Sequence, residues 1–107
     1  MSGYDLGMST IDVASAADIP PGGRLVHLHG DTPIAIFNDE GVLYALDDRC
    51  PHANAPLSDG DVEDGMVICP LHGWEFKLAD GSCSLVPDGA RTYPIRVENG
   101  RVLLDVS

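Results

Sequence analysis

Two stretches decide the interpretation of this 107-residue chain: Cys50-Pro-His52 and Cys69-Pro-Leu-His72-Gly-Trp-Glu-Phe76. Each stretch offers one thiolate and one imidazole, and residues 53–68 separate them. Paired cysteines and histidines at such spacings, in loops that carry proline and small residues, indicate a metal site. Two thiolates and two imidazoles suit either a tetrahedral zinc ion or an iron–sulfur cluster.

The order of the ligands differs from that of the common zinc finger, in which two cysteines in a turn precede two histidines on a helix. Here each loop carries both kinds of ligand, and no helical pattern lies between the loops. Either each loop serves one metal ion, or both cysteines bind one ion and both histidines bind another. The residues alone leave open a diiron cluster, a zinc site and a pair of loops without metal.

The motif CPH followed by CPLHGWEF resembles the two cluster-binding loops of the Rieske family, and the flanking sequence is compatible with that family over essentially the whole chain. The resemblance implies one 2Fe–2S cluster, with Cys50 and Cys69 on the buried iron. His52 and His72 would hold the outer iron near solvent. The alternative from a different class is a structural zinc module in a protein–protein adaptor.

Short strands and frequent turns predict an antiparallel all-β fold, a sandwich or barrel-like domain over residues 1–107. A small cluster-binding subdomain is expected at about 46–77, and a loose tail at 1–8. Residues 15–23 predict a turn or a single helical turn. Hairpin turns are expected at 38–41, 64–65, 79–81 and 99–100. The expected strands are 10–13, 24–29, 33–37, 42–46, 61–63, 66–69, 74–76, 82–85, 92–98 and 101–106.

The residues beside the motif bear on the reduction potential of such a cluster. Histidine ligation places Rieske potentials at roughly −150 to +300 mV. High-potential members of the family carry hydroxyl donors where Trp74 and Phe76 stand here, and an additional disulfide-forming cysteine in each loop. These differences imply the low-potential branch, which comprises Rieske ferredoxins of aromatic-ring dioxygenase systems and small subunits of assimilatory nitrite reductases.

The resemblance therefore implies an electron carrier and not an enzyme. Rieske oxygenases add a large domain with a mononuclear iron site built from two histidines and a carboxylate, and only His27 and His29 remain outside the loops. We expect a monomer that shuttles single electrons from a flavin-dependent ferredoxin reductase to a terminal oxygenase. The alternative is a fixed small subunit of an assimilatory nitrite reductase, beside its large subunit.

Composition narrows the partners and the compartment. A formal net charge of −11 at pH 7 argues against nucleic acid and anionic membranes, and no apolar run approaches the ~18 residues of a membrane span. With two cysteines used as ligands, Cys83 has no disulfide partner, which fits a reducing cytoplasm. Acidic residues beside the loops form either a docking surface or a solvated face: Asp47, Asp48, Asp59, Asp61, Glu63 and Asp64.

Four other residues attract attention. His27 and His29 alternate along a predicted strand and so share a face; we expect an exposed pair there, because a second metal site would need a third ligand. Cys83 is expected to be a small packed thiol. Trp74 is expected to pack beneath the second loop.

Overall fold

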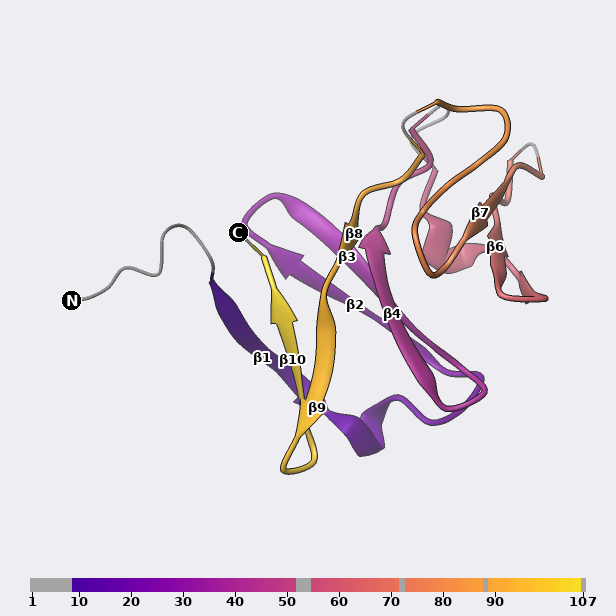
Figure 1. The fold of residues 1–107 in the computed structure, drawn as a ribbon. Helices are drawn as coiled ribbons and strands as arrows, with labels where there is room; N and C mark the ends of the chain where they lie inside the picture. The colour runs from indigo at the N-terminus through magenta and orange to yellow at the C-terminus, as the bar shows by residue number, and fades with distance from the viewer. Residues whose placement is uncertain (1–8, 52–54, 72, 88, 107) are drawn as a thin grey trace.

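The computed structural model describes residues 9–51, 55–71, 73–87 and 89–106 (Figure 1). Within these residues the chain is almost entirely strands and turns, which confirms the all-β prediction. The tail predicted at 1–8 lies outside the described residues. The elements are β1 (Thr10–Ser15), η1 (Ala16–Asp18), β2 (Arg24–His29), β3 (Thr32–Asp39), β4 (Val42–Asp47), η2 (Leu57–Asp59), β5 (Val62–Glu63), β6 (Met66–Ile68), β7 (Glu75–Lys77), β8 (Thr92–Tyr93), β9 (Ile95–Glu98) and β10 (Arg101–Asp105).

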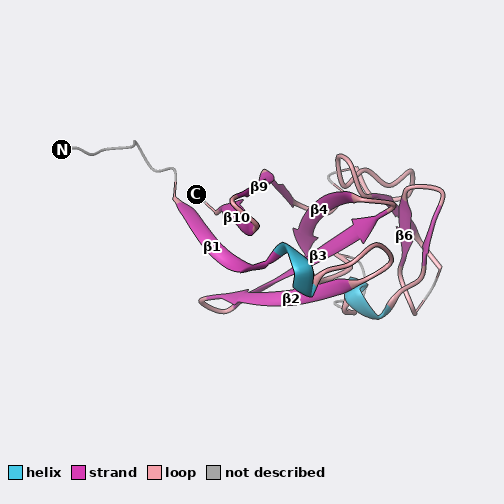
Figure 2. Cartoon of the chain, turned by 90° about the horizontal axis from the view of Figure 1, so that it is seen from below, coloured by secondary structure: helices cyan, strands magenta, loops and turns pink. Residues whose placement is uncertain are grey.

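The strands form three antiparallel sheets, with the orders β1-β10-β9, β2-β3-β4-β8 and β5-β6-β7. Figure 1 shows β1, β10 and β9 on one side of the four-stranded sheet and the β6–β7 hairpin on the other. Figure 2, seen from below, again separates β1 and β10 from β6 along the length of the molecule. In the part of the chain that the structure describes, no helix is long and apolar enough to cross a membrane.

Strand β3 is buried on both faces. Because neighbouring residues of a strand point to opposite faces, Ile34 and Ile36 enter one hydrophobic core while Ala35 and Phe37 enter another. The first, which we call the base core, consists of Ile19, Ile34, Ile36, Ala45, Tyr93, Val102, Leu104 and Val106. The second, which we call the cysteine core, consists of Ala35, Phe37, Leu46, Cys50, Ala55, Leu57, Val67, Cys69, Phe76, Leu78 and Ala90.

Among the described residues, β2 and β3 are joined by the two-residue loop Gly30-Asp31, and three more hairpins close through the two-residue loops Glu40-Gly41, Asp64-Gly65 and Asn99-Gly100. Both residues of each of these last three loops have positive φ, from 52° to 96°. Positive φ at both residues is typical of the type I′ turn, whose twist matches that of the paired strands. The hairpins predicted at 64–65 and 99–100 are confirmed, and the loop predicted at 38–41 narrows to its last two residues.

The hairpin predicted around 79–81 is wrong. Residues 82–85 form no strand, and Cys83 makes only an isolated bridge with Val86. The chain instead folds back on itself: the Ala90 N–H donates to the Gly81 carbonyl at 2.8 Å. A Cβ atom on Gly81 would lie 1.9 Å from the Ala90 carbonyl oxygen, so this approach requires glycine.

The strand predicted at 92–98 is divided at Pro94. Before the proline, β8 pairs with β4; after it, β9 pairs with β10. Proline has no N–H for a ladder, and the Pro94 carbonyl accepts a hydrogen bond from the Asp105 N–H at 3.0 Å. The chain thus passes at Pro94 from the four-stranded sheet to the β1-β10-β9 sheet.

Tyr93 joins the end of β4 to β8. Its hydroxyl donates to an Asp47 carboxylate oxygen, and the Arg91 guanidinium lies 4.7 Å from the centre of its ring. The Asp47 N–H donates to the Arg91 carbonyl at 2.9 Å. Burial and the neighbouring Asp47 carboxylate raise the pKa of Tyr93 to about 12.

A Tyr93→Phe variant should therefore show a pH-dependent loss of stability. The pKa of Tyr93 in the fold, about 12, exceeds its ordinary value of 10.0, so the phenol contributes its full stabilisation below the lower value. That contribution is lost as the pH rises through the higher value. Urea unfolding at a series of pH values should show that the difference in free energy of unfolding between wild type and variant shrinks as the pH rises from 10.0 to about 12. A difference that stays constant over this range would contradict the raised pKa of Tyr93.

Candidate metal centre

Cys50 lies just beyond β4 and is fully buried. Its backbone N–H donates to the Ala55 carbonyl at 2.7 Å, which closes the first loop on itself. This hydrogen bond fixes the backbone of Cys50 at the start of the loop. His52 belongs to residues 52–54, which lie outside the described part of the chain, so its role stays a prediction.

A buried carboxylate anchors the start of this loop. Asp48 is 6% exposed and accepts two hydrogen bonds from Ser58, from the backbone N–H at 2.6 Å and from the hydroxyl at 2.8 Å. Its own N–H donates to the Pro33 carbonyl at 2.8 Å. Asp48 thus holds the residues before Cys50 against η2 on one side and β3 on the other.

This position corrects the prediction for the acidic residues. The sequence predicts Asp48 on a docking or solvated surface, but it is the one charged side chain among the described residues that is buried. The alternation of side chains along β4 predicts this burial. Tyr44 and Leu46 face the cysteine core, and the same alternation continued past the end of β4 directs Asp48 to that core. Asp47 points to the opposite face, where it meets Tyr93.

Cys69 follows β6 and is 1% exposed. Its N–H donates to the Trp74 carbonyl at 2.7 Å, and its carbonyl accepts from the Gly73 N–H at 3.0 Å. Gly73 has φ of 73°, which the tight return of the chain requires. His72 lies outside the described residues and remains a predicted ligand.

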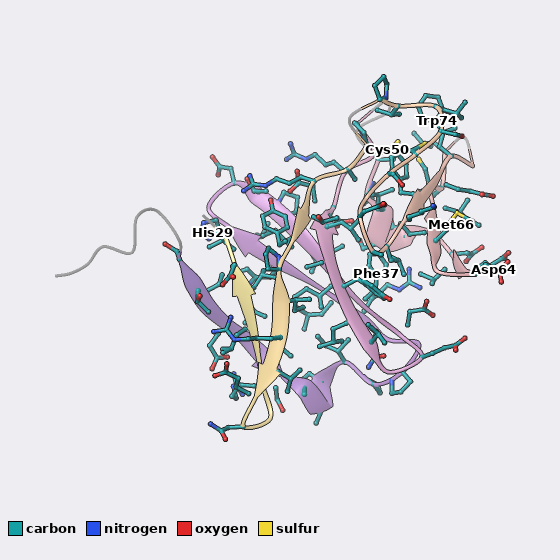
Figure 3. The ribbon with its side chains drawn as sticks, viewed as in Figure 1. His29, Phe37, Cys50, Asp64, Met66 and Trp74 are labelled. Carbon is teal, nitrogen blue, oxygen red and sulfur yellow. The ribbon has the colours of Figure 1, made fainter. Side chains whose placement is uncertain are left out.

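The two cysteines reach the same core from different hairpins. Both belong to the cysteine core, together with Phe76, which is fully buried, and Trp74 is partly buried against that core. In Figure 3, Cys50 and Trp74 lie at one end of the molecule and Asp64 marks the opposite tip of the β5–β6 hairpin. Two buried thiols in an apolar setting, each on a hydrogen-bonded loop, are a donor set that fits an iron–sulfur cluster.

The remaining candidate residues lie elsewhere. His27 and His29 lie on β2, opposite Ile34 and Thr32; His27 is half-buried and His29 is exposed. Among the described residues, no group of three or more potential metal ligands forms. Cys83 is partly buried against the cysteine core, which confirms the packed thiol.

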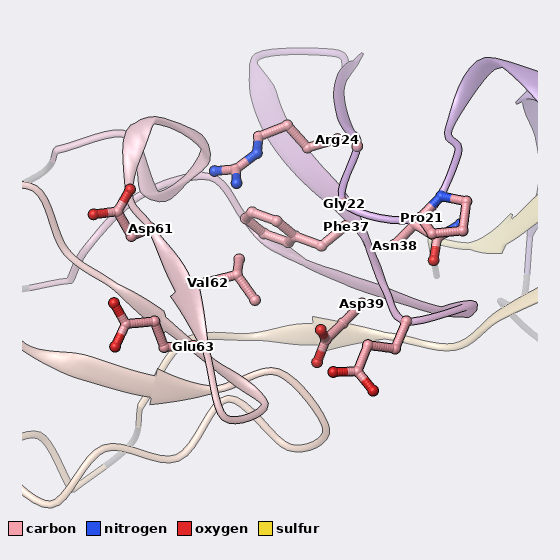
Figure 4. A pocket seen from close by; sticks show the side chains of 11 residues that line it. Pro21, Gly22, Arg24, Phe37, Asn38, Asp39, Asp61, Val62 and Glu63 are labelled. Carbon is pink, nitrogen blue, oxygen red and sulfur yellow. The ribbon is translucent and has the colours of Figure 1, made fainter.

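A separate cavity of about 450 Å³ lies between the turn that precedes β2, the end of β3 and strand β5 (Figure 4). Arg24 and Phe37 line one side, and the carboxylates of Asp39, Asp61 and Glu63 line others. Neither Cys50 nor Cys69 lines it, so this cavity is distinct from the candidate metal centre.

Sequence reasoning missed two groups that support the centre, namely the Asp48–Ser58 contact and the side chain of Arg24. Arg24 Nη1 donates to the Ser58 carbonyl at 2.9 Å and also to the Gly60 carbonyl. These contacts join residues 10 to 36 positions apart in the sequence. No local pattern contains such information.

Comparisons with known proteins find relatives that match most of the chain. The 3-phenylpropionate/cinnamic acid dioxygenase ferredoxin subunit of Escherichia coli strain K12 is 39% identical over 102 residues, covering 92% of this chain and 95% of that protein. A solved complex of reduced oxygenase and oxidised ferredoxin in carbazole 1,9a-dioxygenase contains a chain with TM-score 0.79 and 28% identity, covering 89% of this chain and 91% of that one.

A protein from Mycobacterium tuberculosis, assigned as the small subunit of an NADH-dependent nitrite reductase, has TM-score 0.82 and 28% identity. The match covers 94% of this chain and 96% of that one. A family model described as the Rieske [2Fe-2S] domain matches residues 9–97. The chain therefore belongs to the Rieske [2Fe-2S] domain family, whose cofactor is a 2Fe–2S cluster.

Proposed function

We propose that Cys50, His52, Cys69 and His72 bind the cluster and that the protein carries single electrons from a flavin-dependent reductase to a terminal oxygenase. The observation that carries this proposal is the meeting of two buried cysteines, from two hairpins, in one apolar core. When bound, the cluster supplies a one-electron redox centre. The β5-β6-β7 sheet falls within 46–77, which supports the proposal of a cluster-binding subdomain there.

The residues of the chain hold this centre and shield it from water. Burial of Cys50 and Cys69 keeps solvent from the two sulfur ligands. The loop hydrogen bonds fix the backbones of both cysteines, and ligands held on fixed backbones need less rearrangement to bind a metal. The assignment of His52 and His72 is supported by their spacing from the cysteines in the sequence.

The partners are proposed from the relatives and from charge. The Escherichia coli relative is the ferredoxin subunit of a dioxygenase, and the carbazole dioxygenase structure contains an oxygenase with its ferredoxin. A net charge of −11 suits fast, weak docking on basic partner surfaces. We propose a monomeric cytoplasmic carrier that transforms no organic substrate itself.

The likeness to the Mycobacterium tuberculosis protein supports a second candidate function, that of a nitrite reductase small subunit. Electron transfer separates the two. Holoprotein mixed with NADH and the reductase of a dioxygenase system should lose its oxidised-cluster absorbance in a stopped-flow experiment, and substrate-loaded oxygenase should restore it. Reduction or reoxidation that occurs only with a nitrite reductase large subunit would favour the second candidate.

Cysteine substitutions test the ligands directly. Cys50→Ser and Cys69→Ser should abolish or severely weaken the cluster, because each removes a sulfur ligand. Cys83→Ser is the matched control and should retain about two irons and two acid-labile sulfides per chain, as the wild type does. Iron and sulfide assays read the result; one bound zinc and no sulfide in the wild type would contradict the proposal.

The reduction potential should lie near the low end of the Rieske range, on the order of −150 mV. Phe76 is buried in the cysteine core and has no hydroxyl to donate to a sulfur. A Phe76→Tyr variant should raise the potential, because a donor to the sulfur stabilises the reduced, more negative cluster. Protein-film voltammetry measures both, and a wild-type potential above about +100 mV would rule out this explanation.

A further inference from the structure

Arg24 connects the four-stranded sheet to the segment between the two cysteine loops. Its guanidinium carbon lies 5.2 Å from the centre of the Phe37 ring, and Phe37 belongs to the cysteine core. From there Nη1 donates to the carbonyls of Ser58, at 2.9 Å, and Gly60. Figure 4 shows the guanidinium extending past Phe37 toward the chain near Asp61.

The segment that Arg24 holds contacts the first cysteine loop. Ser58 donates two hydrogen bonds to Asp48, two residues before Cys50. Leu57 is fully buried in the cysteine core beside it. A displacement of Ser58 would therefore move the start of the loop that carries Cys50.

The same segment contacts the second cysteine loop. The Asp61 carbonyl accepts a hydrogen bond from the Ile68 N–H at 2.9 Å, one residue before Cys69. Gly60 passes so close that a Cβ atom there would lie 1.9 Å from the Ile68 carbonyl oxygen. Backbone therefore packs directly on backbone, and the position of Gly60 determines the position of Ile68.

We propose that Arg24 is a positioning residue for the cluster, which sets the relative placement of the two cysteine loops through residues 58–60. A charged donor forms stronger hydrogen bonds to carbonyls than a neutral one, and one guanidinium nitrogen here donates to two carbonyls of the shared segment. The proposal rests on the assignment of Cys50 and Cys69 as ligands.

The test compares the same substitution at two arginines. Arg24→Met keeps an apolar chain over Phe37 and removes the donors. Arg101→Met is the matched control, because Arg101 on β10 contacts only the Asp12 carboxylate among the hydrogen-bond partners that the structure describes. Three properties of the holoprotein are measured: the rate of iron loss to a chelator, the electron paramagnetic resonance spectrum of the reduced state, and the reduction potential.

Arg24→Met should release iron roughly tenfold faster than wild type, as expected for the loss of hydrogen bonds to a charged donor. Its resonance spectrum and potential should shift as well, because ligand placement changes. Arg101→Met should match the wild type in all three. Arg24→Lys keeps the charge and a donor, so it should recover much of the wild-type behaviour and provides the comparison if Arg24→Met does not fold.

The outcomes separate this inference from the ligand assignment. A wild type that binds no iron–sulfur cluster would overturn both. A wild type that binds the cluster, with Arg24 variants identical to Arg101→Met in spectrum, potential and iron release, would overturn the positioning role alone. Faster iron release with an unchanged spectrum and potential would also overturn it, since general loosening of the fold would explain that result.

Discussion

The burial of β3 on both faces is the constraint on which the rest of the structure depends. The run from Ile34 to Phe37 contributes alternately to two cores, so neither core can form without the strand that the other uses. The β1-β10-β9 sheet closes the base core, and the hairpins with Cys50 and Cys69 close the cysteine core. The half that carries Cys50 and Cys69 is therefore fixed to the sheet by Ala35 and Phe37 of β3, together with Leu46 of β4. Its loops do not have to supply their own scaffold.

In this acidic chain, two charged side chains, Arg24 and Asp48, form hydrogen bonds that hold loops in place. The chain has only six lysines and arginines against seventeen acids, and Arg24 is directed to backbone carbonyls instead of carboxylates. Asp48 is buried, yet both of its oxygens accept hydrogen bonds from Ser58, which offsets the loss of hydration. Arg101 and Asp12 form an exposed ion pair on the β1-β10-β9 sheet, where screening by solvent makes such pairs weak.

The parts of this fold that a sequence predicts are those encoded by neighbouring residues. Alternation identified most strands, and Asn99-Gly100 identified a hairpin, because the backbone conformation of such turns is a local property. The local pattern wrongly predicts a strand at 82–85, because the return of the chain depends on the approach of Gly81 to Ala90, which lies nine residues further along. The cysteines were recognisable from spacing, whereas the contact of Asp48 with Ser58 depends on the folded chain; the positions of His52 and His72 remain predictions.

The hydrogen bond from the Asp47 N–H to the Arg91 carbonyl has a consequence for how this architecture can vary. The chain leaves the four-stranded sheet after Asp47 and returns to it at Thr92, so both ends of the intervening excursion lie side by side. The segment 48–91, which contains the cysteines, is thus an insertion whose two ends are adjacent. Insertions are best tolerated in this arrangement. Evolution or an engineer could lengthen, shorten or exchange that module while leaving the ladder between β4 and β8 in register.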